Sequence, residues 1–388
     1  MQTSHVYRAD PAPVAGASPA PAIRLALCTA GEIWGGIERF VLTLAPALRS
    51  AGIDPLVILF HEALLARKLR AARIRVEVLD RHAKYDPRTV GQLRRLLREQ
   101  GIDVLHVHGY KATVAGSLAA CGLAVKIVKT EHGLVEPFPG WRGLPAYSRL
   151  AANVTLDRIA SRYFVDAAVF VSRDLQGQHP FSSSGMAPRV IYNGIDVPPA
   201  PAAARRGGRA TFAIGIVGRI VTVKGHLHLL EALARLRHLR DIHLHVFGDG
   251  PLEQTCRRVC RELDLDGRVS FEGFEPAIHE KIAALDLLVM PSLHEGLPYV
   301  LLEAMALKVP VVASRVGGIR EAMEEDECGV LVAPGDPAVL AEAIERVYHC
   351  RELRSALARR GHETVHRRFL ASRMVGEYVD LYRELIGN

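Results

Sequence analysis

Apolar, β-branched segments alternate with longer helical segments along this chain, and this alternation constrains its fold more than any other feature. Continuous apolar strands are typical of a parallel sheet that is covered on both faces by helices. The first half is therefore predicted to be a doubly wound, Rossmann-like α/β domain. Its predicted strands are 23–30, 55–60, 75–80, 103–108, 125–131 and 167–172. Apolar residues recur at helical spacing in 38–51, 63–73, 88–100 and 111–121.

The same alternation begins again after residue 209, so the chain is predicted to contain a second domain of this kind. The intervening segment 197–209, VPPAPAAARRGGR, lacks periodicity and is expected to be a linker. Predicted strands follow at 212–218, 242–248, 269–273, 287–291, 309–314 and 329–333, and predicted helices at 337–349, 352–361 and 371–386. We expect an N-terminal domain at 22–196, a C-terminal domain at 210–365 and a last helix, 366–388, that packs back toward the N-terminal domain. Two such domains facing each other leave a cleft at the carboxyl ends of their strands.

Composition narrows the class of protein. Hydrophobic residues make up 49% and charged residues 23%, as in soluble globular enzymes. No apolar run approaches the roughly 20 residues of a membrane-spanning helix, and the Ala/Pro-rich residues 1–21 lack the pattern of a signal peptide and are expected to be disordered. The scattered cysteines complete no metal motif, which indicates reduced core cysteines and a cytoplasmic protein. The net charge of +7 favours an acidic lipid surface or a phosphorylated substrate over nucleic acid, because no nucleic-acid-reading motif is present.

The most informative segment is HEGLPYVLLEAMA at 294–306, which follows a predicted strand and opens a helix at Pro298. Free amides at the start of this helix, next to Gly296, suit a diphosphate. Glu303, one turn into the helix, can accept two hydrogen bonds from a ribose diol. Glu295, just ahead of the helix, can bind sugar hydroxyls. The alternative is a pair of ordinary helix carboxylates, one of which complements the helix dipole.

A second segment, GIVGRIVTVKG at 215–225, places Arg219 and Lys224 just beyond a strand end. Two cations at this position can hold both phosphates of a nucleoside diphosphate and stabilise it as a leaving group. The alternative interpretation is two solvated loop cations.

Glu295 and Glu303 are separated by seven residues, and this spacing resembles the E-x7-E signature of retaining glycosyltransferases of family 4, which have the two-domain GT-B architecture. The resemblance covers about residues 23–365. It implies that Arg219, Lys224, Glu295 and His132 are catalytic, and that the donor contacts Gly296, Leu297, Pro298 and Glu303. This sequence has EGLP where the family often has EGFG, so it departs from the pattern at Leu297 and Pro298.

Two strand-to-helix segments in the first half are also candidates. GGIERF at 35–40 is similar to a GGxE loop of the family that meets the donor phosphate or the acceptor. The resemblance therefore assigns Gly36 to the donor, and Gly35 and Glu38 to the acceptor side; a plain turn is the alternative. His132 in KTEHG and His108 in LHVH end predicted strands, and His108 is an acceptor-side candidate. His106 is a weaker candidate, because a histidine at a strand end is often structural.

Three further segments have expected roles. FEGF at 271–274 lies where such enzymes usually hold the base, so Phe274 is a donor candidate. Asn193 in NGID is expected to hydrogen-bond at the hinge. Asp264-Leu265-Asp266 spells the metal-binding pattern Asp-x-Asp, but it precedes Gly267 and a predicted strand, so a solvated turn is the better interpretation. We expect no metal and no cofactor besides the nucleotide-sugar co-substrate.

The resemblance implies transfer of a sugar from a nucleotide-diphosphate sugar to an acceptor hydroxyl with retention of configuration. We expect front-face substitution, and a lipid-linked or growing saccharide as acceptor. Segment 136–164 mixes Trp141, Tyr147 and Phe164 with arginines, so it either binds an acidic membrane, at the inner face of the plasma membrane, or is a covering helix. Alternatives are a small-molecule glycosyltransferase, a nucleotide-sugar 2-epimerase, an oxidoreductase and a binding module. An oxidoreductase is disfavoured because no G-x-G-x-x-G follows the first strand.

Overall fold

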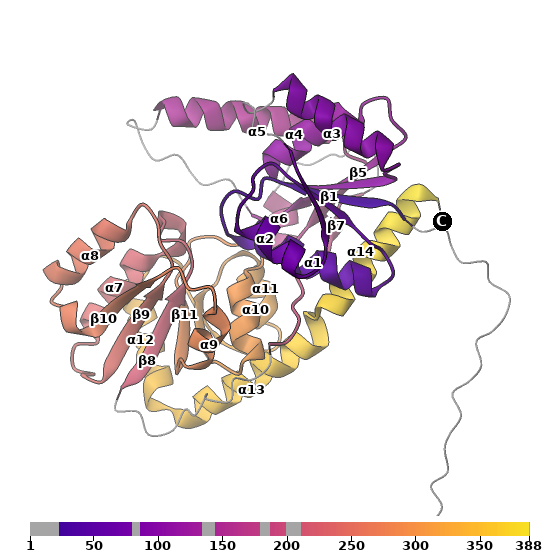
Figure 1. The fold of residues 1–388 in the computed structure, drawn as a ribbon. Coiled ribbons are helices and arrows are strands. Elements are labelled where there is room, and N and C mark those ends of the chain that lie inside the picture. Colours follow the sequence, from indigo (N-terminus) through magenta and orange to yellow (C-terminus); the bar gives the residue numbers. More distant parts are fainter. Residues whose placement is uncertain (1–22, 80–85, 134–143, 179–186, 199–210, 388) are drawn as a thin grey trace, which may run out of the picture.

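A computed structural model describes residues 23–79, 86–133, 144–178, 187–198 and 211–387. Two α/β domains, each built on one parallel sheet, are arranged one beside the other (Figure 1). The predicted disordered tail at 1–21, most of the predicted linker and Trp141 lie outside the described residues. The predicted fold class, two doubly wound Rossmann-like domains, is confirmed.

The N-terminal sheet has the strand order β3-β2-β1-β4-β5-β6-β7, in which every neighbouring pair is parallel. Its strands are β1 Leu25–Thr29, β2 Leu56–Leu59, β3 Arg75–Val78, β4 Val104–His108, β5 Lys126–Glu131, β6 Ala167–Phe170 and β7 Arg189–Val190. Its helices are α1 Gly36–Ser50, α2 Leu64–Ala71, α3 Pro87–Glu99, α4 Gly109–Ala120, α5 Leu144–Phe164 and α6 Arg173–Gln178. The two-residue strand β7 was not predicted, because so short an edge strand leaves no pattern in the sequence.

The C-terminal sheet has the order β10-β9-β8-β11-β12-β13 and is also parallel throughout. Its strands are β8 Phe212–Val217, β9 Ile242–Phe247, β10 Val269–Gly273, β11 Leu287–Met290, β12 Val311–Ser314 and β13 Val330–Val332. Its helices are α7 His226–Arg235, α8 Glu253–Glu262, α9 Ile278–Ala283, α10 Tyr299–Ala306, α11 Gly317–Met323, α12 Pro337–His349 and α13 Arg351–Arg368, followed by α14 Ala371–Ile386. Short 3₁₀ turns lie at Thr222–Lys224 and Asp266–Arg268.

Local sequence explains where several helices begin. Asp336 caps α12 by accepting hydrogen bonds from the amides of Ala338 and Val339, and Pro337 occupies the first helical position. Asp86 caps α3 in the same way. The central strands β1, β4 and β11 are buried along their whole length, which agrees with their uninterrupted apolar sequences. These features depend on residues that are neighbours in the chain, so most of the predicted strands and helices agree with the structure.

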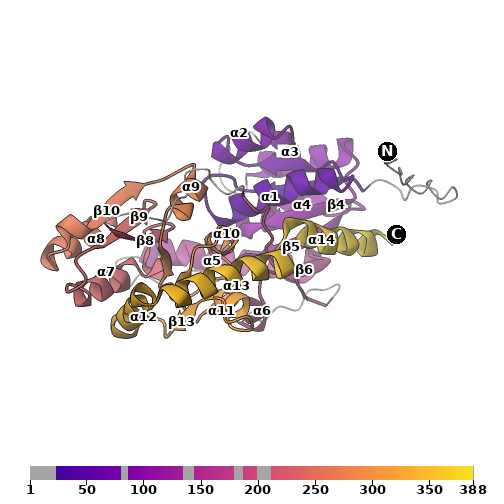
Figure 2. The same cartoon turned by 90° about the horizontal axis from the view of Figure 1, so that it is seen from below.

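The chain crosses from the C-terminal domain back to the N-terminal domain through α13 and α14, which Figure 2 shows as two consecutive helices. Ile195, on the outward crossing, pairs with Leu370, on the return crossing, in an isolated parallel bridge. Tyr378 and Tyr382 of α14 are completely buried, and their hydroxyl groups hydrogen-bond Thr130 and His106. Helix α13 continues to Arg368, beyond the expected domain end at residue 365.

Candidate active site

Strands β8 and β11 of the C-terminal domain end at the same edge of their sheet. Lys224, predicted after the first of these strands, and Glu295, predicted after the second, meet there. Lys224, in the turn after β8, donates a hydrogen bond to Glu295 in the loop after β11, with 2.6 Å between Nζ and Oε1. The Ser292 hydroxyl donates to the same carboxylate oxygen at 2.8 Å. Glu295 is held in this way by residues of its own domain. A side-chain exposure of 27% for Lys224 and 11% for Glu295 leaves both within reach of a ligand.

The loop after β8 packs directly on the loop that contains Glu295. Gly225 has a φ of +72°, and a Cβ at this position would lie 2.0 Å from the carbonyl oxygen of Pro291. Only glycine fits such a turn against a neighbouring backbone. Arg219, in the same loop, is exposed and forms no ion pair with any described residue. The structure therefore brings Lys224 to Glu295 and leaves the Arg219 guanidinium facing solvent.

Gly296 marks a contact between the two domains. A Cβ on Gly296 would lie 2.2 Å from the carbonyl oxygen of His132, which belongs to the N-terminal domain. The next residue, Leu297, accepts a hydrogen bond at 2.6 Å from the side-chain amide of Asn193, as expected for a residue at the hinge. The sequence predicts that a diphosphate approaches the backbone next to Gly296. In the structure it is the backbone of the other domain that approaches.

Helix α10 begins one residue later than predicted. Pro298 is the N-cap residue with an extended backbone, and the first helical residue is Tyr299. Glu303 nevertheless lies one turn into the helix, as the sequence indicated. The amide of Gly318, at the start of α11, donates to the carbonyl of Gly296 at 2.6 Å. The two glycines at the start of α11, Gly317 and Gly318, thus support the loop between Glu295 and α10.

Glu303 is held by residues of both domains. Its side chain is 4% exposed, and Oε1 lies 2.6 Å from Nη2 of Arg39 in the N-terminal domain and 3.2 Å from Nε2 of His279 on α9. Burial alone would raise the pKa of the Glu303 carboxyl, but the hydrogen bond from His279 and the charge of Arg39 hold it below its ordinary value. The carboxylate is therefore ionised at neutral pH.

Two of the strand-end histidines are paired. The Nδ1 atom of His108 lies 3.1 Å from Nε2 of His132, because their parallel strands β4 and β5 end side by side. Burial lowers the pKa of His108 well below its usual range and that of His132 to about 4. Both rings are therefore neutral at physiological pH. Both ring nitrogens of His106 have hydrogen-bond partners, Tyr382 and Thr130, which makes His106 structural.

The remaining candidates are Glu38, Gly36 and Phe274. Glu38 is 8% exposed, and burial raises the pKa of its carboxyl to about 7, although hydrogen bonds from the amides of Glu38 and Gly35 act in the opposite direction. Its carboxylate thus caps its own helix. Gly36 is exposed, and nothing would lie within 4 Å of a Cβ there. Phe274, just after β10, is 45% exposed.

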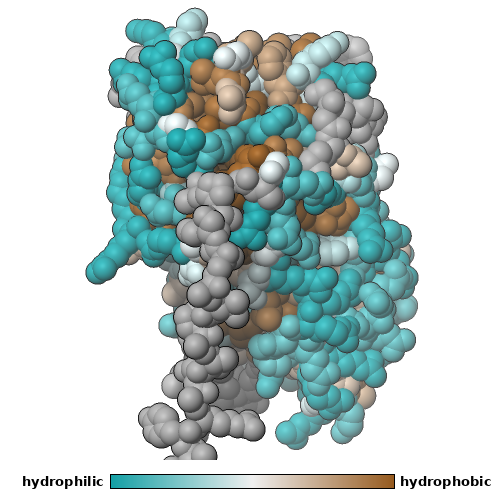
Figure 3. All heavy atoms as spheres, turned by 90° about the vertical axis from the view of Figure 1, so that its right-hand side faces the viewer, coloured by the Kyte–Doolittle hydropathy of each residue, from teal (hydrophilic) through white to brown (hydrophobic). Residues whose placement is uncertain are grey.

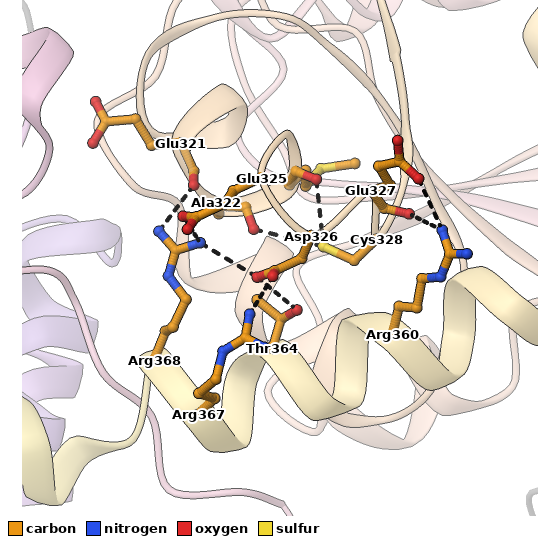
Figure 4. Close-up of polar contacts among 11 residues, drawn as sticks. Glu321, Ala322, Glu325, Asp326, Glu327, Cys328, Arg360, Thr364, Arg367 and Arg368 are labelled. Carbon is orange, nitrogen blue, oxygen red and sulfur yellow. Dashed lines mark hydrogen bonds and ion pairs between the residues drawn. The ribbon is translucent and has the colours of Figure 1, made fainter.

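A separate cluster around Glu321 joins the two domains. The Glu321 carboxylate, on α11, accepts hydrogen bonds from the amides of Arg173 and Asp174 at 3.0 and 2.6 Å, and from the Tyr192 hydroxyl at 2.8 Å. Its backbone carbonyl accepts from Arg368 at the end of α13 (Figure 4). Glu321 therefore joins the N-terminal domain to the helix that returns to it.

The same close-up shows how α13 is attached to the loop after α11. Arg367, Arg368 and Thr364 all converge on the Asp326 carboxylate, and Arg360 contacts Glu327 (Figure 4). Paired acids and arginines of this kind fix the end of α13, from which the chain crosses to the N-terminal domain.

Sequence reasoning missed three residues of the site: Arg39, His279 and Ser292. Arg39 directly follows Glu38 in GGIERF, and Ser292 lies three residues before Glu295. Both residues are therefore sequence neighbours of predicted site residues. His279 had no signal, because only the tertiary structure brings α9 beside α10. Among the described residues, no group of three or more His, Cys, Asp or Glu could hold a metal ion. None of the described helices is long and apolar enough to cross a membrane.

Two family models match the chain. Glycosyltransferase Family 4 matches residues 34–198, and Glycosyl transferases group 1 matches residues 209–364. The chain therefore belongs to the glycosyltransferases, with a family 4 N-terminal domain, a group 1 C-terminal domain and the GT-B architecture.

Among its relatives, the lipopolysaccharide core biosynthesis glycosyltransferase LpsE of Rhizobium meliloti is 37% identical over 165 residues, or 42% of this chain and 48% of LpsE. The match thus spans about half of that protein. The putative glycosyltransferase EpsD of Bacillus subtilis is 28% identical over 321 residues, or 78% of this chain and 82% of EpsD. The crystal structure of Anabaena HepE in complex with UDP and glucose has a TM-score of 0.80 at 23% identity, and the match covers 92% of this chain and 99% of HepE. At this identity, the likeness to HepE shows the shared fold.

Proposed function

We propose that this glycosyltransferase moves a sugar from a nucleotide-diphosphate sugar to an acceptor hydroxyl with retention of anomeric configuration, in polysaccharide or glycoconjugate synthesis. The observation that carries the proposal is the hydrogen bond of 2.6 Å between Lys224 and Glu295, at the carboxyl ends of β8 and β11. It joins a cation suited to a phosphate and a carboxylate suited to sugar hydroxyls in one place. The names of HepE, which has been crystallised with UDP and glucose, and of LpsE, a lipopolysaccharide glycosyltransferase, support the donor and the pathway class.

The diphosphate of the donor would lie between the two loops and the start of α10. Lys224 and Arg219 would neutralise its charge, and the free amides at the helix N-terminus would donate to its oxygens. Glu303 would accept the two hydroxyl groups of the ribose, and Phe274 would lie near the base. The loop at Leu297 and Pro298 would support the amides rather than contact the sugar.

We propose front-face substitution for the transfer itself. The bond between the anomeric carbon and the phosphate oxygen breaks while the acceptor oxygen bonds to the same face of that carbon. The proton of the acceptor hydroxyl passes to the departing phosphate, so no protein base is required, and catalysis depends on positioning and electrostatic stabilisation. Glu295 suits hydroxyl binding better than nucleophilic attack, because Lys224 and Ser292 already engage its Oε1. Neutral His132 would lie near the transferred sugar.

We further propose that no divalent metal takes part. The Asp-x-Asp pattern is at the wrong edge of the sheet for this chemistry, because Asp264 and Asp266 are exposed in the turn before the amino end of β10. The donor site that we propose is at the carboxyl ends of β8 and β11. Full turnover in the presence of a chelator is the expected result; turnover that disappears in chelator and returns with Mn²⁺ would contradict it.

The test of the proposed function is a thermal-shift screen with nucleoside diphosphates and nucleotide sugars, since a ligand that binds only the folded chain raises its melting temperature. The hit is then incubated with candidate acceptors, and the anomeric configuration of the product is determined by NMR. An inverted product, or a covalent glycosyl adduct on Glu295, would contradict front-face substitution. Isomerisation or hydrolysis of the donor without any transfer would favour the 2-epimerase.

An acceptor carried by a lipid is our proposal for the N-terminal domain. Leu156, Ile159 and Tyr163 are 43, 49 and 70% exposed, and their spacing places them on one face of α5. The opposite face is anchored by the buried Lys129, which donates to Asp157 at 2.7 Å. On the side of the molecule shown in Figure 3, hydrophobic side chains also gather in the upper half, over the N-terminal domain.

Exposed arginines on α5, Arg158 and Arg162, complement an acidic lipid surface next to this apolar face. We expect the chain to sediment with vesicles that contain acidic phospholipid, and an Ile159→Ser, Tyr163→Ser variant to remain in the supernatant. Val339→Ser is the control, because Val339 is exposed on the C-terminal domain. If the unaltered chain does not sediment with the vesicles at low salt, the proposed membrane binding is contradicted and a small, soluble acceptor is favoured.

A further inference from the structure

Arg39 lies at the point where α1 of the N-terminal domain meets α10 of the C-terminal domain. Its Nη2 atom is 2.6 Å from Oε1 of Glu303 and 2.6 Å from Nε2 of His279. An arginine guanidinium keeps its positive charge throughout the physiological pH range. Arg39 is therefore the group that supplies positive charge to Glu303.

Glu303 depends on such a counter-charge. A carboxylate on a side chain that is 4% exposed loses most of its hydration, and without a cation nearby it becomes easier to protonate. Protonation would turn one oxygen from an acceptor into a donor. A ribose diol offers two hydrogens, and an ionised carboxylate, with about four acceptor positions, can bind both of them while Arg39 occupies another position.

We propose that Arg39 is a positioning residue for the donor: it holds Glu303 ionised and correctly oriented to bind the ribose, and it does so only when the two domains are closed. The counter-charge comes from α1, whereas the carboxylate is on α10. When the domains separate, Glu303 retains only His279. A residue of the N-terminal, acceptor-side domain thus sets the affinity for a ligand bound by the C-terminal domain. The inference rests on the proposed function, because it takes Glu303 as the ribose anchor.

The test measures binding of ADP, GDP, CDP and UDP, and of their 2′-deoxy counterparts, by isothermal titration calorimetry. The unaltered chain is expected to prefer the ribonucleotide. Arg39→Met is expected to weaken ribonucleotide binding about tenfold, as for the loss of one hydrogen bond with a charged partner, and to change 2′-deoxynucleotide binding little. Arg39→Lys, which keeps the charge, should recover part of the preference. Arg24→Met is the matched control, because Arg24 forms an ion pair of 2.6 Å with Asp103 before the amino end of β1.

A double-mutant cycle separates an effect through Glu303 from a direct one. If Arg39 acts through Glu303, Arg39→Met combined with Glu303→Gln should bind no more weakly than Glu303→Gln alone. Additive losses, or an Arg39→Met variant that keeps the preference for ribose, would overturn the inference while leaving the donor site in place. No binding of any nucleoside diphosphate by the unaltered chain would overturn the proposed function as well. Circular dichroism and melting temperature show whether each variant is folded. If Arg39→Met does not fold, Arg39→Lys still tests the inference.

Discussion

The two glutamates of the E-x7-E pair are held in different ways. Glu295 is hydrogen-bonded by Lys224 and Ser292, both from its own domain. Glu303 is paired with Arg39 from the other domain, and it is more deeply buried than Glu295. One half of the candidate donor site is therefore assembled by the C-terminal domain alone, and the other half is complete only when the domains meet. Substitutions in the two halves should consequently fail in different ways.

The largest effect is expected from Lys224→Ala, which breaks the half that the C-terminal domain assembles. It removes the cation that we propose stabilises the leaving diphosphate, so kcat/KM should fall by an amount equivalent to about 2–4 kcal/mol, as for the loss of one transition-state donor. The melting temperature should change little. Lys126→Ala is the control, because Lys126 pairs with Asp166 at 3.1 Å at the amino end of β5. Turnover close to that of the unaltered chain would show that the phosphates are bound elsewhere.

Gly296→Ala tests the contact between the two domains. The new Cβ would lie 2.2 Å from the His132 carbonyl oxygen, a backbone atom that cannot rotate away, so the domains must separate slightly. We expect a loss of roughly 1–3 kcal/mol in stability or donor binding, typical of overpacking, and an increased radius of gyration by small-angle X-ray scattering. Gly133→Ala adds the same methyl group beside the same histidine, where nothing lies within 4 Å, and should be neutral. Equal behaviour of the two variants would contradict a tight domain contact.

Acid should weaken the N-terminal domain before the C-terminal one. Burial lowers the pKa of His106 and His108, and that of His132 to about 4, so the unfolded chain binds more protons than the folded chain below about pH 6.5. Their contribution to stability is present above that pH and is lost as the pH falls toward 4. Glu38 acts in the opposite direction, because its pKa is raised to about 7. In the C-terminal domain, burial lowers the pKa of His226 to about 4.

Hydrogen exchange at pH 7 and pH 5, corrected for intrinsic rates, would measure this difference. Strand β4 contains His106 and His108, and His132 directly follows β5. Amides of β4 and β5 should therefore lose more protection on acidification than those of β8 and β9. The opposite order would mean that the buried histidines do not limit the stability of the N-terminal domain.

The smallest effect is expected from Glu321→Gln. The side-chain amide keeps one acceptor oxygen but presents a donor to the amides of Arg173 and Asp174, so about 1–2 kcal/mol of stability should be lost. Differential scanning calorimetry should show a lower melting temperature. Glu324→Gln, which removes an exposed ion pair with Arg315, should be nearly neutral. A Glu321→Gln variant as stable as Glu324→Gln would show that this anchor contributes little to domain closure.

Much of this architecture follows from the sequence alone. Local patterns determine the strand positions, most helices and the division into two α/β halves. They also determine the places of Lys224, Glu295 and Glu303. These patterns are uninterrupted apolar strands, capping residues such as Asp336, and the position of Glu303 one turn into a helix. These patterns act between residues that are near each other in the chain, so the sequence displays them directly.

The tertiary structure alone decided which residues of the two domains meet. Arg39 and His279 come to Glu303 from segments about 260 and 20 residues away, and His132 comes to Gly296 from the other domain. No periodicity encodes such contacts, because they depend on how two independently patterned sheets are placed by the crossings at Ile195 and Leu370. The two carboxylates were visible in the sequence, whereas the counter-charge that keeps one of them ionised was not.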